Sequence, residues 1–167
     1  MTLISFRKVE ARMTNERDLS ARDGGELDGF HIGHLPAGIG AEVSDFATEW
    51  ADVNFATRVW ERQVEDGYRV DLRVHVLRGE RLTDLDAVRE FLAEYQERDA
   101  ATWELADFTH PDGPGLIGAD QAFWLAGPGV AVNVLGDPEV VDAAALRSIA
   151  AAMAVLDHDA SVLTSEG

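Results

Sequence analysis

The chain contains no cysteine among its 167 residues. Disulfide bonds, thiolate nucleophiles and sulfur-ligated metal sites are therefore excluded. Lysine is almost absent as well, because Lys8 is the only one and arginine supplies the other basic side chains. The 14 basic groups face 31 acidic ones, which gives a formal net charge of −17. A field of that sign repels phosphate backbones and anionic lipid surfaces, so we expect no nucleic-acid partner and no membrane insertion.

Long apolar runs are also missing. The longest covers residues 149 to 156, well short of the roughly 20 residues of a membrane-spanning helix. Residues 1 to 12 carry no apolar stretch of signal-peptide length, and we expect a cytoplasmic protein. What remains is 46% hydrophobic and 27% charged residues, a composition typical of globular proteins. The pattern predicts a flexible N-terminal arm over 1–29, one domain over 30–156 and a flexible tail over 157–167.

The first half of the domain is rich in strands. Residues 30 to 35 predict a short strand, and the segments 43 to 50 and 53 to 63 predict a hairpin with Thr48 opposite Thr57 and Trp50 opposite Phe55. A second hairpin leads through Asp66-Gly67, a dipeptide that favours a type I′ turn, into the alternating strand "GYRVDLRVHVLRG" at 67 to 79. This turn places Val59 opposite Val74 and Thr57 opposite Val76 on one face, with Arg62 opposite Asp71 and Trp60 opposite Arg73 on the other.

The second half adds two helices and three strands. Apolar residues at helical spacing follow Thr83, the expected N-cap, and a second helix is expected over 142 to 156. Between them, residues 103 to 110, 120 to 126 and 129 to 135 predict strands. The most economical architecture is an α+β fold, in which an antiparallel sheet of six to seven strands carries both helices on one face. The other face is then left to water or to a partner.

Motifs for chemistry are scarce. The stretch "GPGLIG" at 113 to 118 matches a dinucleotide loop in letters only, because no helix follows it to hold a pyrophosphate. His31 and His34 lie on opposite faces of a strand, and no histidine or carboxylate set has metal-ligand spacing, so we expect no metal and no cofactor. No serine lies in a nucleophile motif. The sequence therefore predicts no hydrolytic centre.

The strongest candidate site is the sheet face opposite the predicted core. We expect this outer face to carry Arg58, Trp60, Arg62, Arg73 and His75. Tryptophan and arginine are the residue types enriched at the centres of protein interfaces. Ion pairs of this kind also occur on ordinary solvated sheets, so both interpretations fit.

Two resemblances bear on the function. The end of the chain, with "AFWLA", "VAVNV" and then "LRSIAAAM" in a helix, resembles small bacterial domains of unknown function often found beside anti-sigma and other membrane proteins. The whole pattern is also similar to PsbP-like domains. These resemblances imply binding or accessory roles and no catalytic residues.

The leading hypothesis is a non-enzymatic binding or accessory module. It would contact a protein partner or a small anionic ligand through the Arg/Trp face, and a homodimer is one form of such a contact. The alternative is an enzyme with a cleft between helices and sheet, using His75, His110 or a buried carboxylate as the base.

Overall fold

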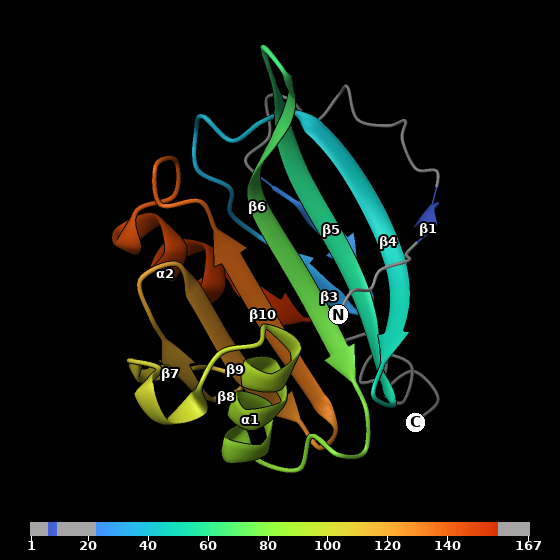
Figure 1. Ribbon diagram of the computed structural model, residues 1–167, viewed down its shortest axis with the longest axis vertical. Helices are drawn as coiled ribbons and strands as arrows, with labels where there is room; N and C mark the ends of the chain where they lie inside the picture. The colour runs from blue at the N-terminus through green and yellow to red at the C-terminus, as the bar shows by residue number, and fades with distance from the viewer. Residues whose placement is uncertain (1–6, 10–22, 157–167) are drawn as a thin grey trace, which may run out of the picture.

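The computed structural model describes residues 7–9 and 23–156. A sheet of eight strands crosses the molecule in the order β1-β4-β5-β6-β10-β9-β8-β7, and every pairing is antiparallel (Figure 1). In that order the strands are β1 (Arg7–Val9), β4 (Glu42–Trp50), β5 (Val53–Val64), β6 (Gly67–Arg78), β10 (Val130–Gly136), β9 (Gln121–Gly127), β8 (Gly113–Ile117) and β7 (Ala106–His110).

A second, smaller sheet has the strand order β11-β3-β2. Its strands are β2 (Gly25–Leu27), β3 (Phe30–Ile32) and β11 (Met153–Val155). The predicted strand at 30 to 35 thus belongs to a separate sheet, and the stretch "GPGLIG" contributes strand β8 rather than a loop. Two strands, β1 and β2, lie within the predicted N-terminal arm, whereas the predicted tail at 157–167 lies outside the described residues.

Both predicted helices form, with shifted limits. Helix α1 (Leu85–Tyr95) is capped by Asp84 rather than Thr83, because the Asp84 carboxylate accepts a hydrogen bond from the backbone N–H of Ala87. The short 3₁₀ helix η2 (Ala100–Thr102) follows it. Helix α2 (Ala143–Ala151) ends five residues before the predicted limit at 156, because the chain turns into β11.

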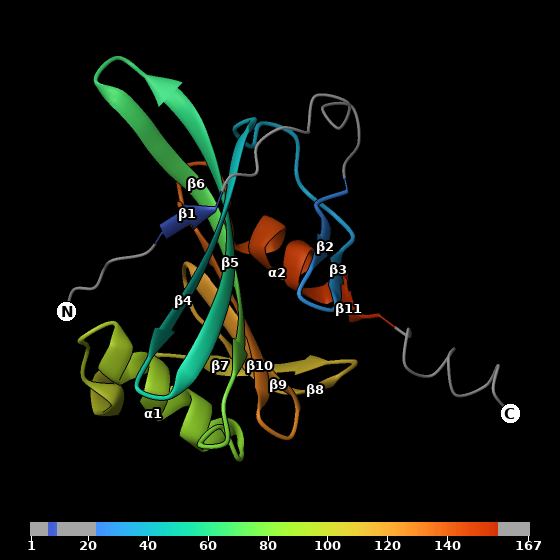
Figure 2. The ribbon, with the colours of Figure 1, turned by 90° about the vertical axis from the view of Figure 1, so that its right-hand side faces the viewer.

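The two helices pack on opposite faces of the large sheet, which corrects the prediction that they share one. Figure 2 shows α1 on one side, and α2 with the small sheet on the other. Neighbouring residues of β9 contribute to the cores on both faces, since Trp124 lies in the core under α2 and Phe123 lies in the core under α1. The runs "AFWLA" and "VAVNV" are apolar on both faces apart from Asn133, which is typical of strands buried on both sides. We therefore name the two faces of the large sheet the α1 face and the α2 face.

The β4–β5 hairpin is tighter than predicted. Ala51 and Asp52 form a two-residue connection with φ angles of 52° and 69°. This connection pairs Trp50 with Val53 and Thr48 with Phe55, so the predicted partners Phe55 and Thr57 are each displaced by two residues. A displacement of two residues keeps every side chain on its expected face.

Candidate functional site

The five residues predicted to share one outer face lie on two different faces. Trp60 is part of the core on the α2 face. Arg58 and Arg62 are each two residues from Trp60 along β5, so their side chains lie on that same face. His75 instead packs edge-on against Phe55, which belongs to the core under α1. Arg73, two residues from His75 on β6, lies on the α1 face as well.

One extra residue in β6 causes this separation. Trp60 pairs with Leu72, but the next residue of β5, Glu61, pairs with Val70, so Asp71 has no partner across the hairpin. Such a β-bulge shifts the register by one residue, and a shift of one moves every side chain beyond it to the other face. The predicted position of Trp60 opposite Arg73 is therefore wrong. Arg62 does not lie directly opposite Asp71 either, but the two side chains form the expected ion pair, with 2.9 Å between Arg62 Nη2 and Asp71 Oδ2.

The observed register replaces those pairings. Beyond the bulge, Val59 lies opposite Arg73 and Thr57 lies opposite His75, rather than opposite Val74 and Val76 as predicted. Near the turn, Arg62 pairs with Arg69. The turn residues are Glu65 and Asp66, one position earlier than predicted, because Val64 pairs with Gly67.

Arg58 and Trp60 are occupied by structural contacts. The Arg58 guanidinium donates to both Asp45 carboxylate oxygens at 2.7 and 2.9 Å, and to the Gly24 carbonyl at 2.8 Å. The bond to Gly24, which precedes β2, ties the small sheet to the large one. The side chain of Trp60 is 3% exposed. Neither residue lies free on an outer surface.

Arg62 holds the buried carboxylate of the bulge. Asp71 is fully buried, and its Oδ2 accepts bonds from Arg62 Nε at 3.0 Å and from the Gly40 backbone N–H at 2.8 Å. The backbone carbonyl of Asp71 also accepts from the N–H of Asp137. A buried carboxylate with this many donors is a structural anchor for the loop before β4, and these bonds occupy its oxygens.

A row of polar side chains crosses the α1 face in the middle of otherwise apolar strands. The Thr57 hydroxyl and His75 Nδ1 form a hydrogen bond of 2.9 Å, and Gln121 Nε2 donates to Asn133 Oδ1 at 2.8 Å. All four residues are buried, and Asn133 pairs with His75 across β10 and β6. Gln121 Oε1 is buried without a hydrogen-bond partner. We call Thr57, His75, Asn133 and Gln121 the polar row.

The polar row is electrically neutral at pH 7. Burial, with a smaller contribution from the charge of Arg73, lowers the pKa of His75 to about 3. The imidazole therefore carries no charge near neutral pH, and the other three side chains of the row do not ionise. The row is therefore a buried and uncharged set of polar side chains, bonded to one another in two pairs.

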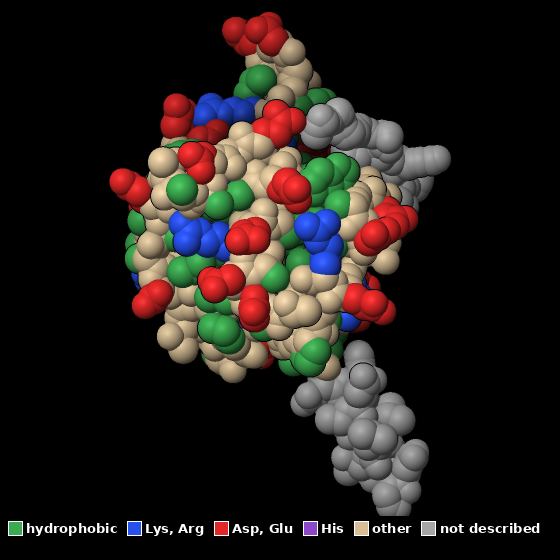
Figure 3. Space-filling model, turned by 60° about the horizontal axis from the view of Figure 1, so that its bottom comes forward, with side chains coloured by type: hydrophobic (Ala, Val, Ile, Leu, Met, Phe, Trp, Pro, Cys, Tyr) green, Lys and Arg blue, Asp and Glu red, His purple; other side chains and the backbone are tan. Residues whose placement is uncertain are grey.

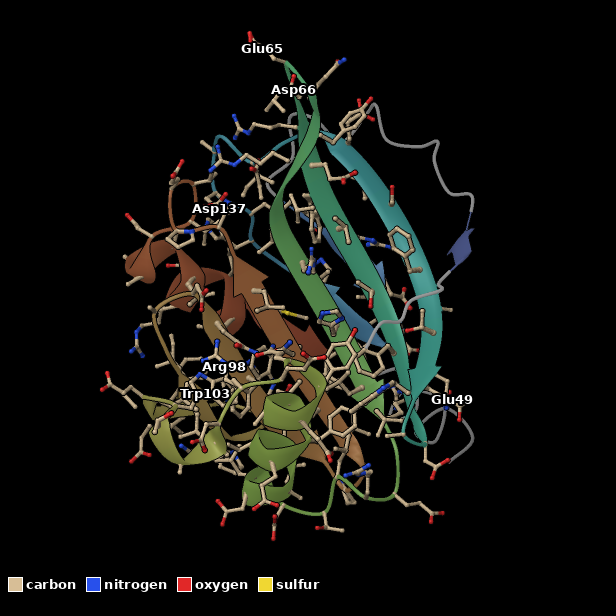
Figure 4. The ribbon with its side chains drawn as sticks, viewed as in Figure 1. Glu49, Glu65, Asp66, Arg98, Trp103 and Asp137 are labelled. Atoms are coloured by element: carbon tan, nitrogen blue, oxygen red, sulfur yellow. The ribbon has the colours of Figure 1, made fainter. Side chains whose placement is uncertain are left out.

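Charge enters only at the edge of the row. Arg73 is exposed, and it lies near enough to Tyr95, the last residue of α1, to oppose the rise in the pKa of Tyr95 that burial causes. Arg98 follows α1 and lies over the ring of Trp103, 4.4 Å from its centroid (Figure 4).

The sequence prediction included Arg73 and His75 but missed Thr57, Asn133 and Gln121. Asn133 was an available signal, since it is polar within the apolar run "VAVNV", whereas Gln121 follows Asp120 at the start of an apolar run and does not stand out.

His110 lies on the α2 face and is held on both ring nitrogens. Its Nδ1 accepts from the Asp112 backbone N–H at 2.9 Å, and its Nε2 donates to the Ala150 carbonyl at 3.0 Å. The ring stacks on Trp124 with centroids 4.1 Å apart, and burial lowers the pKa of His110 despite the opposing charge of Asp112. His110 thus joins the β7–β8 hairpin to α2.

Comparison with known proteins finds no matching family model, no matching curated protein and no matching solved structure. Within residues 7–9 and 23–156, no three His, Cys, Asp or Glu side chains are grouped so that they could hold a metal ion. No helix in the same residues is long and apolar enough to cross a membrane.

Proposed function

We propose that this protein is a non-enzymatic binding module that accepts a carboxylate-bearing ligand at Arg73, beside the polar row. The observation that carries the proposal is the state of Arg73. Among the arginine side chains of residues 23–156, that of Arg73 alone forms no ion pair, no hydrogen bond and no ring contact, although acidic groups outnumber basic ones in the chain by 31 to 14. An exposed guanidinium of this kind is available to an external anion.

The surroundings of Arg73 favour a carboxylate. A guanidinium can donate two parallel hydrogen bonds to one carboxylate, a geometry that a single arginine satisfies by itself. The neighbouring row is neutral because His75 stays unprotonated. The row therefore adds no second positive charge of the kind that would favour a multiply charged anion over a single carboxylate. Polar atoms of the ligand would be met by uncharged groups such as the Tyr95 hydroxyl. An accessory role of this kind also agrees with the resemblance to PsbP-like domains.

Binding is favoured over catalysis because the proposed bases are occupied or too weak. Both ring nitrogens of His110 are engaged, and the Asp71 carboxylate is held by Arg62 and the Gly40 N–H. His75 is hydrogen-bonded to Thr57, but with a pKa of about 3 it is a poor proton acceptor at neutral pH.

A titration of the full chain with benzoate, followed by two-dimensional NMR, tests the proposal. We expect saturable shifts of the backbone amides of Arg73, His75 and Asn133. Because a bidentate charged contact would be lost, Arg73→Gln should weaken binding by about tenfold or more. The matched control is Arg81→Gln, which removes an exposed arginine that lies beside Glu94 and should leave the affinity unchanged.

Benzyl alcohol, which has the same ring without the carboxylate, should produce no saturable shift at Arg73. Linear shifts with benzoate, or equal affinities for the wild-type chain and Arg73→Gln, would contradict the proposal.

A further inference from the structure

The β5–β6 hairpin extends beyond the rest of the large sheet. Each strand has 12 residues, but β4 begins opposite Glu61 and β10 ends opposite Leu72. Residues 62 to 71 therefore form a two-stranded ribbon, beside which no third strand lies in the part of the chain that the structure describes. The ribbon projects from the body of the molecule in Figure 1, and Glu65 and Asp66 mark its end in Figure 4. We call residues 63–68 the hairpin tip.

The hairpin tip exposes apolar surface that the fold does not use. Val64 is 38% exposed and Tyr68 56% exposed. Within the described residues, the only other large hydrophobic side chain exposed to this degree is Val155. Two of the three thus lie at the end of one ribbon, outside both core clusters of the described residues. A two-stranded ribbon gains little stability by itself, so this projection is not explained by folding alone.

The two apolar side chains point to opposite sides of the ribbon. Tyr68 pairs with Gln63, and Val64 pairs with Gly67. Because adjacent residues of a strand alternate between faces, Gln63 and Tyr68 share one face and Val64 lies on the other. A ribbon that is apolar on both sides fits between two walls better than on a flat surface.

The base of the ribbon is held firmly on the α2 face. Arg69 donates to Asp137 Oδ2 from Nε at 2.9 Å and from Nη2 at 2.7 Å, and to Glu139 at 2.7 Å. Next to it, Arg62 is bonded to the buried Asp71. The tip is therefore presented by an anchored support, which reduces the entropy that a partner would have to remove on binding.

The charge of the tip determines the kind of partner. Glu65 and Asp66 form the turn between Val64 and Gly67, and the whole chain carries a net charge of −17. A second copy would bring the same negative charge against the tip and is disfavoured. A basic surface is attracted both by the turn and by the long-range field.

We propose that the hairpin tip is a docking element that inserts into an apolar groove with a basic rim on a partner protein. Tyr68 and Val64 contact the two walls of the groove, and Glu65 and Asp66 pair with basic side chains at its rim. This surface is separate from the proposed ligand contact at Arg73, so either proposal can fail without the other.

Site-specific photo-crosslinking identifies the partner. Benzoylphenylalanine replaces Gln63, the cross-strand neighbour of Tyr68, in the full chain, and the crosslink is formed in the cells from which the protein comes. We expect one crosslinked partner with a basic surface. No crosslink from position 63, or a crosslink to a second copy only, would overturn the proposal.

Binding to the purified partner then tests the contacts. The double variants Val64→Ser/Tyr68→Ser and Glu65→Lys/Asp66→Lys should each weaken the affinity by about tenfold or more. Val155→Ser and Glu90→Lys are the matched controls, because they change an exposed hydrophobic and an exposed acidic residue elsewhere. Thermal midpoints equal to that of the wild type confirm that the tip variants fold. Unchanged affinity of both double variants would refute the docking role.

Discussion

Asp71 sets the register of β6 beyond the bulge, and with it the face on which each later side chain lies. It is the unpaired residue of the β6 bulge, and its buried carboxylate is held by Arg62 and the backbone N–H of Gly40. Because the bulge changes the register by one, it sends Leu72 to the α2 face and Arg73 to the α1 face. The contents of the candidate site thus depend on a residue that is not part of it.

His75 makes stability depend on pH in a definite direction. Its pKa is about 3 in the folded protein, below the ordinary value of about 6.5 in an unfolded chain. Between these two values the unfolded state binds a proton that the folded state does not. The contribution of neutral His75 to the free energy of unfolding is therefore fully present above about pH 6.5, and it is lost progressively as the pH falls towards about 3.

We expect this group to lower the free energy of unfolding by about 2 kcal/mol between about pH 7 and about pH 5, a range in which few carboxylates titrate. Urea denaturation at the two pH values measures it. In His75→Gln the same acidification should cost about 2 kcal/mol less, because the titrating group is gone. Equal losses in both proteins would show that His75 takes up its proton in the folded state.

Among the elements, the β4–β5 hairpin carries avoidable backbone strain. Ala51 and Asp52 both adopt positive φ, a region that side chains other than those of glycine and asparagine disfavour. The double variant Ala51→Asn/Asp52→Gly should raise the free energy of unfolding by about 1 kcal/mol in urea denaturation.

The β5–β6 turn provides the control for this change. Glu65 and Asp66 occupy the corresponding two-residue connection but are not among the described residues with positive φ. Glu65→Asn/Asp66→Gly should bring no gain. An equal gain from both double variants would mean that the strain at Ala51 and Asp52 is not the cause.

The elements differ in how well local sequence predicts them. Helix α1 follows from its apolar spacing, because that signal lies within one segment. Strand β8 was missed, since Gly113, Pro114 and Gly115 are turn residues by composition and pair with β7 only in the folded sheet. The α1 face of β9 and β10 was missed for a similar reason, because the polar row forms only when Asn133 and His75 become neighbours.

The whole molecule carries an excess of negative charge. Acidic side chains are dispersed over the face seen in Figure 3, with few arginine side chains among them. Repulsion among like charges opposes the compact state and is screened by salt. We expect the thermal midpoint to rise between about 0.05 M and about 1 M NaCl, where the screening length is only about 3 Å. A midpoint that falls across this range would show that the arginine ion pairs outweigh the repulsion.

Composition and short-range pattern were enough to establish the α+β class, the antiparallel strands, both helices and the acidic surface. These properties depend on residues close together in the chain, whose spacing can be read directly. The assignment of residues to the two sheet faces was decided only by the tertiary structure. One bulged residue moves the side chains of β6 beyond it to the opposite face. Strands that are apolar on both sides can pack against a helix on each face. Neither the face reversal nor the placement of the helices can therefore be read from a single segment.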